Sequence, residues 1–304
     1  MKLLFALVAA AALAWPADSR AALSLSEKDF KGSGRCRFAA HGFALSPQTE
    51  RAIGDSVQKL LERHQAVFGF RTRPDFRVSI RVFGRFEDYT NATLNFYWTN
   101  ATERRAFAGH LINVAGYYSP ATREVVTWRQ HLPGALGTTL LHEAGHAIMD
   151  AHYEDVPLWL LEGSAEYFAF ALHPAGEMNQ ILLRQRWTLL NRWLKDEKLL
   201  PLEALLNADG IEFKQLDPEK AYAMSWSLFQ LLMSSDANRR AMLTLLRERQ
   251  DLSRESPDSA EQMARLYPGG LKRLETQWHS WIRAGAAMTN PPTIRFIDPK
   301  KEQR

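Results

Sequence analysis

Two histidines stand four residues apart, with a glutamate beside the first, in the segment "LLHEAGHAIMD", residues 140–150. In a helix, His142 and His146 would lie one turn apart, separated by about 40° around the axis and about 6 Å along it. Both imidazoles could then reach one ion, and zinc accepts nitrogen ligands at about 2.0–2.1 Å. Glu143 could project beside the metal and take a proton from its water. The spacing therefore indicates two zinc ligands and a general base on one helical turn.

The alternative is an ordinary helix that carries two histidines by chance. The residues around the motif are mostly apolar, which indicates a largely buried helix. Buried histidines and a buried glutamate are costly unless other groups satisfy them, so this setting favours the metal site.

A catalytic zinc site needs a third protein ligand, and two candidates follow the motif. His152 has the metzincin spacing from His146, but Met149 stands where that pattern has the glycine that ends the helix. If the helix continues from about Ala135 to His152, then His152 lies about 240° around the axis from His146 and faces away. Its other role would be that of a histidine at a helix C-terminus, where the helix dipole favours a positive charge.

Glu162 is the better candidate for the third ligand. It lies in "WLLEGSAEY", residues 159–167, on the next predicted helix, where Glu162 and Glu166 share one face. Gly163 is small and would let this helix approach the motif helix closely. Glu166 could accept the free ring N–H of a ligand histidine. Two solvent-exposed glutamates are the alternative, but the apolar neighbours indicate a mostly buried helix.

"HEAGH" followed by "WLLEGSAEY" resembles the gluzincin metallopeptidases, and within them the peptidase MA-like families such as the aminopeptidase N group. The resemblance is specific over about residues 138–170. It implies a thermolysin-like zincin core and one zinc ion, held by His142, His146 and Glu162.

The same resemblance points to a tyrosine that stabilises the oxyanion. Tyr222 stands 60 residues after Glu162, where the aminopeptidase group has a Tyr-x-x-Gly helix start, although Ser225 replaces the glycine here. The alternative is an ordinary core tyrosine.

One segment departs from the aminopeptidase pattern. That group has Gly-x-Met-Glu-Asn before the zinc helix, and its glutamate holds the free amine of the substrate. The comparable segment here is "AGYYSP", which has no carboxylate, so aminopeptidase specificity does not carry over. Gly116, Tyr117 and Tyr118 remain candidates for an edge strand that pairs with an extended peptide.

Hydrophobic periodicity predicts the elements that position these residues. A helix is expected over 47–70, a half-buried strand over 75–84, and a hairpin over 110–128 with its turn at Ser119-Pro120. From Pro133 onward the pattern is helical, with amphipathic segments at 180–194, 221–233, 239–248 and 271–284. These patterns predict an α+β protein with a small mixed sheet and a mostly helical C-terminal half. The expected divisions are 1–21, 22–134, 135–172, 173–289 and 290–304.

The first 21 residues resemble a signal peptide. One lysine precedes thirteen apolar residues, Leu3 to Trp15, and Ser19 and Ala21 fit the small-x-small rule for cleavage after Ala21. A short membrane anchor is the alternative, but the apolar run is shorter than the roughly 20 residues of a spanning helix. No later stretch is apolar enough to span a membrane. The mature protein is therefore expected to be periplasmic or secreted.

Composition excludes several other classes of protein. The 304 residues are 46% hydrophobic, as in a globular protein, and the net charge is only +4 and spread along the chain, which disfavours nucleic-acid binding. Cys36 is the single cysteine, so no intramolecular disulfide can form.

Together these residues predict a zinc metallopeptidase with a peptide or protein substrate. Two alternatives remain open: a binding protein that has kept the zincin fold without activity, and a zinc amidase that acts on a cell-wall amide.

Overall fold

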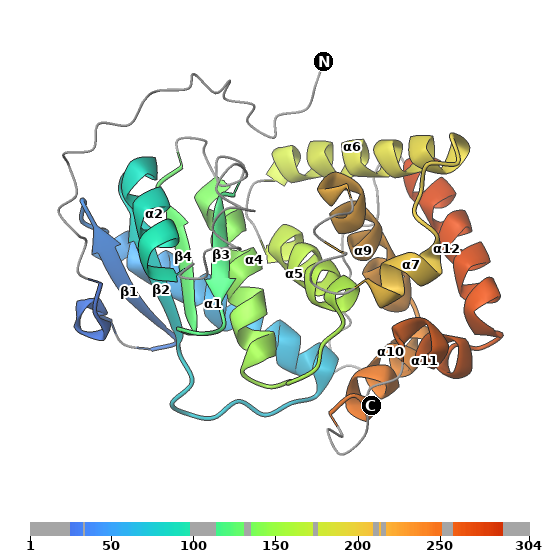
Figure 1. Cartoon of the computed structure of the whole chain (residues 1–304), viewed down its shortest axis with the longest axis horizontal. Helices are drawn as coiled ribbons and strands as arrows, with labels where there is room; N and C mark the ends of the chain where they lie inside the picture. Colours follow the sequence, from blue (N-terminus) through green and yellow to red (C-terminus); the bar gives the residue numbers. More distant parts are fainter. Residues whose placement is uncertain are drawn as a thin grey trace. The chain divides into compact units, whose positions relative to one another are not determined.

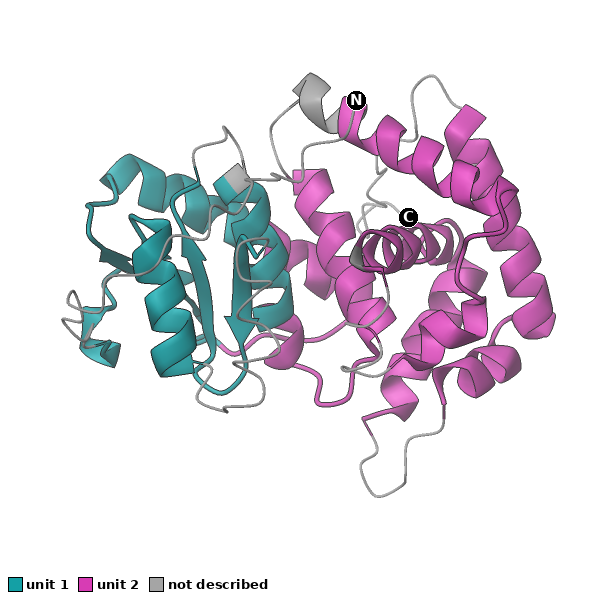
Figure 2. Ribbon diagram, turned by 45° about the horizontal axis from the view of Figure 1, so that its top comes forward, with its two compact units in different colours: residues 1–58, 74–147 teal, residues 59–73, 148–304 magenta. Residues whose placement is uncertain are grey.

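The computed structural model describes residues 25–32, 34–97, 114–130, 135–172, 176–208, 213, 217–250 and 258–287. The chain divides into two compact units, which Figure 2 colours separately. Unit 1 comprises residues 1–58 and 74–147, and unit 2 comprises residues 59–73 and 148–304.

Unit 1 contains a four-stranded mixed sheet with the order β1-β2-β4-β3. Its strands are β1 (Cys36–His41), β2 (Val78–Phe83), β3 (Gly116–Ser119) and β4 (Glu124–Trp128). β1 and β4 pair with β2 in parallel, whereas β3 pairs with β4 antiparallel. The predicted hairpin is therefore confirmed as β3 and β4. β3 is the last strand in this order, so it forms an edge of the described sheet.

Helices cover both faces of this sheet. α1 (Pro47–Phe68) passes behind the sheet in Figure 1, and α2 (Phe86–Ala92) lies in front of it. α2 packs on β2 and β4 and is followed by a π-helical turn, Thr93–Tyr97. The helix expected over 47–70 is confirmed by α1.

The prediction that β2 is half-buried is wrong, because all six of its residues are buried. Ser79 and Arg81 alternate with apolar residues in the sequence, a pattern that normally marks a solvent-exposed face. Here these polar side chains have partners beneath a covering layer, so they can be buried without a large penalty.

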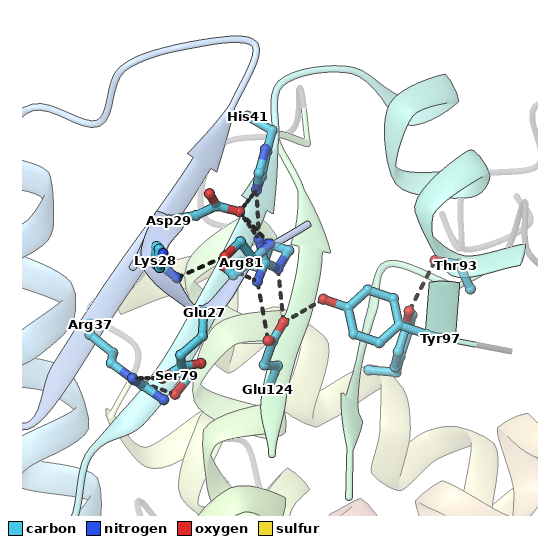
Figure 3. A network of polar contacts seen from close by, with 12 residues as sticks. Glu27, Lys28, Asp29, Arg37, His41, Ser79, Arg81, Thr93, Tyr97 and Glu124 are labelled. Carbon is cyan, nitrogen blue, oxygen red and sulfur yellow. Dashed lines mark hydrogen bonds and ion pairs between the residues drawn. The ribbon is translucent and has the colours of Figure 1, made fainter. Parts of the chain in front are cut away.

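Arg81 is the centre of the polar network on this face, and only 1% of its surface is exposed (Figure 3). Its Nε and Nη2 donate to the two carboxylate oxygens of Glu124, at 2.8 and 3.1 Å. Its Nη1 donates to Asp29 at 3.0 Å and to Nε2 of His41 at 2.9 Å. Since a guanidinium has only donors, His41 Nε2 must be the unprotonated acceptor.

Cys36 lies at the start of β1 and is a buried free thiol. Burial raises its pKa to about 12, because the surroundings solvate the thiolate poorly.

Unit 2 is helical in its described residues, as the sequence predicts for the C-terminal half. Its main helices are α5 (Leu158–Leu172), α6 (Gly176–Lys195), α7 (Leu202–Asn207), α9 (Pro218–Leu232), α10 (Asp236–Glu248), α11 (Ser259–Leu266) and α12 (Gly270–Ala287). The four predicted amphipathic segments correspond to α6, α9, α10 and α12. The core is rich in tryptophan, and Trp278 Nε1 donates to Ser227 Oγ at 3.0 Å.

The protein is thus of mixed α+β class, with a small mixed sheet and a helical C-terminal half. Among the helices described, none combines the length and the apolar character that a membrane-crossing segment requires.

The network around Arg81 predicts a pH-dependent contribution to stability. Burial lowers the pKa of His41 from 6.5, and the charge of Arg81 lowers it further. Nearby carboxylates act in the opposite direction: Asp29, Glu124 and Asp88. The unfolded chain therefore binds the His41 proton at a higher pH than the folded chain, so its contribution to stability is lost as the pH falls from 6.5 through the lower folded-state pKa.

The test is urea unfolding of the wild type and His41→Gln at several pH values between about 7.5 and 5. Glutamine keeps an acceptor but does not titrate. We expect the free energy of unfolding of the wild type to fall relative to that of the variant as the pH is lowered. A difference that does not change with pH would contradict this expectation. Asp29 does not interfere, because its pKa is lowered from 3.8 and its own transition lies further toward acid.

Candidate metal centre

Helix α4 (Ala135–Asp150) carries the histidine motif, and its Thr139 lies against Gly116 of the edge strand β3. A Cβ atom placed on Gly116 would lie 2.8 Å from Cγ2 of Thr139, so only glycine permits this approach. Gln130 fixes the same contact, since its Nε2 donates to Oγ1 of Thr139 at 3.2 Å and to the carbonyl of Ala115 at 3.4 Å. His142 and Glu143 follow Thr139 by three and four residues, so they share its face of the helix.

The two histidines of the motif have the separation that one zinc ion requires. The Nε2 atoms of His142 and His146 lie 3.1 Å apart. Two nitrogens held at about 2.0–2.1 Å in a tetrahedral site would lie about 3.3 Å apart. His146 and Glu143 are buried, with 8% and 9% of their surfaces exposed. The side chains of His142 and His146 could therefore bind one zinc ion with little rearrangement.

Glu162 completes this set. One ligand atom from each of His142, His146 and Glu162 can be chosen such that all three lie within 4.8 Å of one another. Two imidazoles and one carboxylate form a donor set that is typical of catalytic zinc sites, in which a fourth position stays open.

His152 is not part of this cluster. α4 ends at Asp150 rather than at His152, and the carbonyl of Met149 accepts from the amides of both His152 and Tyr153, at 3.1 and 2.9 Å, a sharing that is common at helix ends. The expectation that Met149 keeps the helix running through residue 152 is therefore wrong by two residues. The His152 ring stacks on Phe70 with centroids 3.9 Å apart, and its Nδ1 lies 2.7 Å from the carbonyl of Ile148.

Glu166 forms an ion pair with Arg186 of α6, and both side chains are mostly buried. The guanidinium also lies over the rings of Phe170 and Trp226, at 4.9 and 5.5 Å from their centroids. Sequence reasoning missed Arg186, although a glutamate on so apolar a helix signals a need for a cationic partner. The role of Glu166 toward a ligand histidine stays a prediction.

Gly163 serves a different contact from the expected one. The sequence suggests that it brings α5 close to α4, but it faces α9: a Cβ there would lie 2.5 Å from the carbonyl oxygen of Ser225. Tyr222 precedes Ser225 by three residues, so it shares the α9 face that packs on α5. Its ring edge meets Phe213, with centroids 5.9 Å apart. Oxyanion stabilisation by Tyr222 stays a prediction.

The candidate substrate strand lies at the edge of the described sheet, as an added peptide strand requires. Tyr117 turns toward α2, and its hydroxyl donates to Oγ1 of Thr93 at 3.1 Å. Tyr118 points to the opposite face, because side chains alternate along a strand. Pairing with a peptide would therefore use the backbone of Gly116, Tyr117 and Tyr118, a role that stays a prediction.

No protein-family model matches this chain, and no curated protein is significantly similar to it. The residues and their geometry therefore carry the functional proposal.

The donor set predicts that each chain binds about one zinc ion. Glu162→Ala removes one of three ligands and should abolish stoichiometric zinc binding after dialysis, whereas His152→Ala should retain it. Metal content measured by inductively coupled plasma mass spectrometry, together with competition by a chromogenic chelator, checks both variants. Loss of zinc from His152→Ala and retention by Glu162→Ala would identify His152 as the third ligand.

The contact at Gly163 predicts a cost for the smallest possible substitution. Gly163→Ala forces α5 and α9 apart and should lower the free energy of unfolding by about 1–3 kcal/mol, which is typical of overpacking. Gly54→Ala is the matched control. Gly54 lies in helix α1, and a Cβ atom there would meet nothing within 4 Å. Alanine at that site should leave stability unchanged or raise it by about 0.5–1 kcal/mol. Equal effects of the two variants in urea unfolding would contradict the close approach.

Proposed function

We propose that the protein is an exported zinc metallopeptidase of gluzincin type with a thermolysin-like core, which hydrolyses peptide bonds. The observation that carries this proposal is the cluster of His142, His146 and Glu162, together with the buried Glu143 that follows His142 in the sequence. Export to the periplasm or beyond the cell rests on the signal-peptide character of the first 21 residues.

His142, His146 and Glu162 would hold the metal. A zinc ion bound there would polarise a carbonyl group and lower the pKa of water from about 15.7 toward about 7. The two histidines come from successive turns of one helix, so their positions are fixed by the same backbone. Glu162 balances one unit of positive charge and leaves a net positive site that favours a developing negative charge.

Glu143 would act as the general base. Its carboxylate accepts a proton from the attacking water as the oxygen bonds to the carbonyl carbon. It then donates that proton to the amide nitrogen as the C–N bond breaks, so the amine leaves in neutral form. Glu143 follows His142 directly in α4, and burial restricts its side chain. A purely structural zinc site would have no need of a carboxylate at this position.

The edge strand β3 would bind the substrate. An extended peptide that adds to β3 places its backbone amides and carbonyls opposite those of Gly116–Ser119. The close contact between Gly116 and Thr139 keeps this strand beside the face of α4 that carries His142 and Glu143. The Tyr222 hydroxyl would donate to the carbonyl oxygen as it becomes negative, a contribution of about 3–4 kcal/mol in comparable sites.

The decisive test is digestion of a diverse peptide library by the wild type and by Glu143→Gln, read by mass spectrometry. The wild type should cleave, and the variant should retain zinc but lose at least about 10²-fold in rate, since it cannot carry the proton. The positions of the cuts then distinguish endopeptidase from exopeptidase activity.

The other outcomes would each replace the proposal. Full activity of Glu143→Gln would remove Glu143 as the base. Zinc-loaded wild type that cleaves no peptide but releases amides from cell-wall fragments would be an amidase. Peptide binding with no cleavage of either substrate would indicate a binding protein with the zincin fold.

A further inference from the structure

The segment Leu25–Lys31 folds over the polar half of the sheet face that α2 covers, and we call it the N-terminal clasp. Asp29 pairs with Arg81 at 3.0 Å, and the carbonyl of Ser26 accepts from Arg81 Nη2 at 3.3 Å. The Phe30 ring packs against the guanidinium groups of Arg81 and Arg37, at 4.6 and 4.9 Å. The clasp therefore supplies two hydrogen-bond partners of the buried Arg81 guanidinium, and its Phe30 ring covers part of that group. Figure 3 shows one of these partners, Asp29, beside Arg81.

The clasp is ordered by its own hydrogen bonds. Ser26 and Asp29 form a capping box, in which Asp29 Oδ2 accepts from the Ser26 amide at 2.8 Å. This bond lowers the pKa of Asp29, and Arg81 lowers it further, although burial acts in the opposite direction. Lys31 exchanges two backbone hydrogen bonds with Phe38 of β1, at 2.9 and 2.7 Å. The clasp thus presents a fixed carboxylate to Arg81.

A chain of contacts continues from Arg81 to the edge strand. Glu124 accepts two hydrogen bonds from Arg81 and a third from the hydroxyl of Tyr97. The ring of Tyr97 meets the edge of Tyr117, with centroids 5.8 Å apart. Tyr117 belongs to β3 and is also held by its hydrogen bond to Thr93.

A second set of contacts links the clasp to β3 through apolar side chains and does not depend on charge. Leu25 of the clasp packs against a buried cluster, as do Tyr97 and Tyr117. The cluster consists of Phe83, Tyr89, Ala92 and Val126. Both sets of contacts therefore converge on Tyr117, which lies opposite Val126 in the ladder between β3 and β4.

We propose that the N-terminal clasp positions the edge strand β3, and that Asp29 and Tyr97 are positioning residues for substrate binding on that strand. Release of the clasp would leave Arg81 buried with fewer partners, and the Arg81–Glu124 pair would have to rearrange. Glu124 holds Tyr97, so the support of Tyr117 would weaken. Release of the clasp should loosen β3 more than the other strands, because β3 is only four residues long and pairs with β4 alone in the described sheet. The substrate role rests on the proposed function, whereas the coupling between clasp and strand does not.

The coupling is tested by amide hydrogen exchange of a peptide covering residues 114–119. Asp29→Asn removes the charge that faces Arg81, and Tyr97→Phe removes only the hydroxyl that bonds Glu124. Each should speed exchange in this peptide by about two- to tenfold, the effect of losing one net hydrogen bond. Peptides from α9 should not change.

Two matched variants control for general destabilisation. Tyr153→Phe removes a hydroxyl that donates to the carbonyl of Phe68 at 3.0 Å in unit 2. Asp236→Asn removes an exposed pair with Arg239. Neither should alter exchange in residues 114–119. If Asp29→Asn and Tyr97→Phe lower the melting temperature but leave this peptide unchanged, the clasp is merely structural and the proposal is overturned.

Kinetics with a peptide identified from the library test the positioning role. Asp29→Asn and Tyr97→Phe should raise KM at least about threefold with a smaller change in kcat, since Glu143 and the zinc ligands are untouched. Asp29→Glu should partly restore KM. Equal losses in kcat and kcat/KM, or lost zinc, would overturn the role. If the wild type cleaves nothing, the proposed function fails while hydrogen exchange still decides whether the clasp controls β3.

Discussion

Helix α4 can lie against the edge strand only because Gly116 has no side chain. Any Cβ at this position would meet Thr139 at less than contact distance and move the helix outward. The consequence reaches the candidate site directly, because His142 and Glu143 follow Thr139 by one turn. The spacing between the edge strand and the helix face that carries His142 and Glu143 therefore depends on the absence of a side chain at Gly116, a residue outside the candidate site.

Each unit holds a buried ion pair that joins two different elements. Arg81 of β2 meets Glu124 of β4, and Arg186 of α6 meets Glu166 of α5. Such pairs add little net stability, since desolvation offsets most of the attraction. Their effect is geometric: an arrangement that separates the partners leaves a buried charge unpaired, so the strands and helices are held in one register.

The sequence predicts most of what depends on local periodicity. The hairpin, the helical C-terminal half and the one-turn spacing of His142 and His146 all follow from patterns within short stretches of sequence. The sequence also predicts that Glu162 joins these histidines, because its helix follows the motif helix directly. The burial of β2, the partner of Gly163 and the pair between Glu166 and Arg186 depend on how separate elements pack on one another. A single sequence contains no periodic signal for such contacts.

Cys36 is a built-in probe for the opening of strand β1 in unit 1. Its thiol is buried on β1, opposite Val78 of β2, and it stays protonated at physiological pH because its pKa is about 12. A thiolate is the reactive form, so an alkylating reagent can modify this residue only when β1 separates from the sheet. Because it is the single cysteine of the chain, its labelling rate reads the opening of this one strand without any engineered probe.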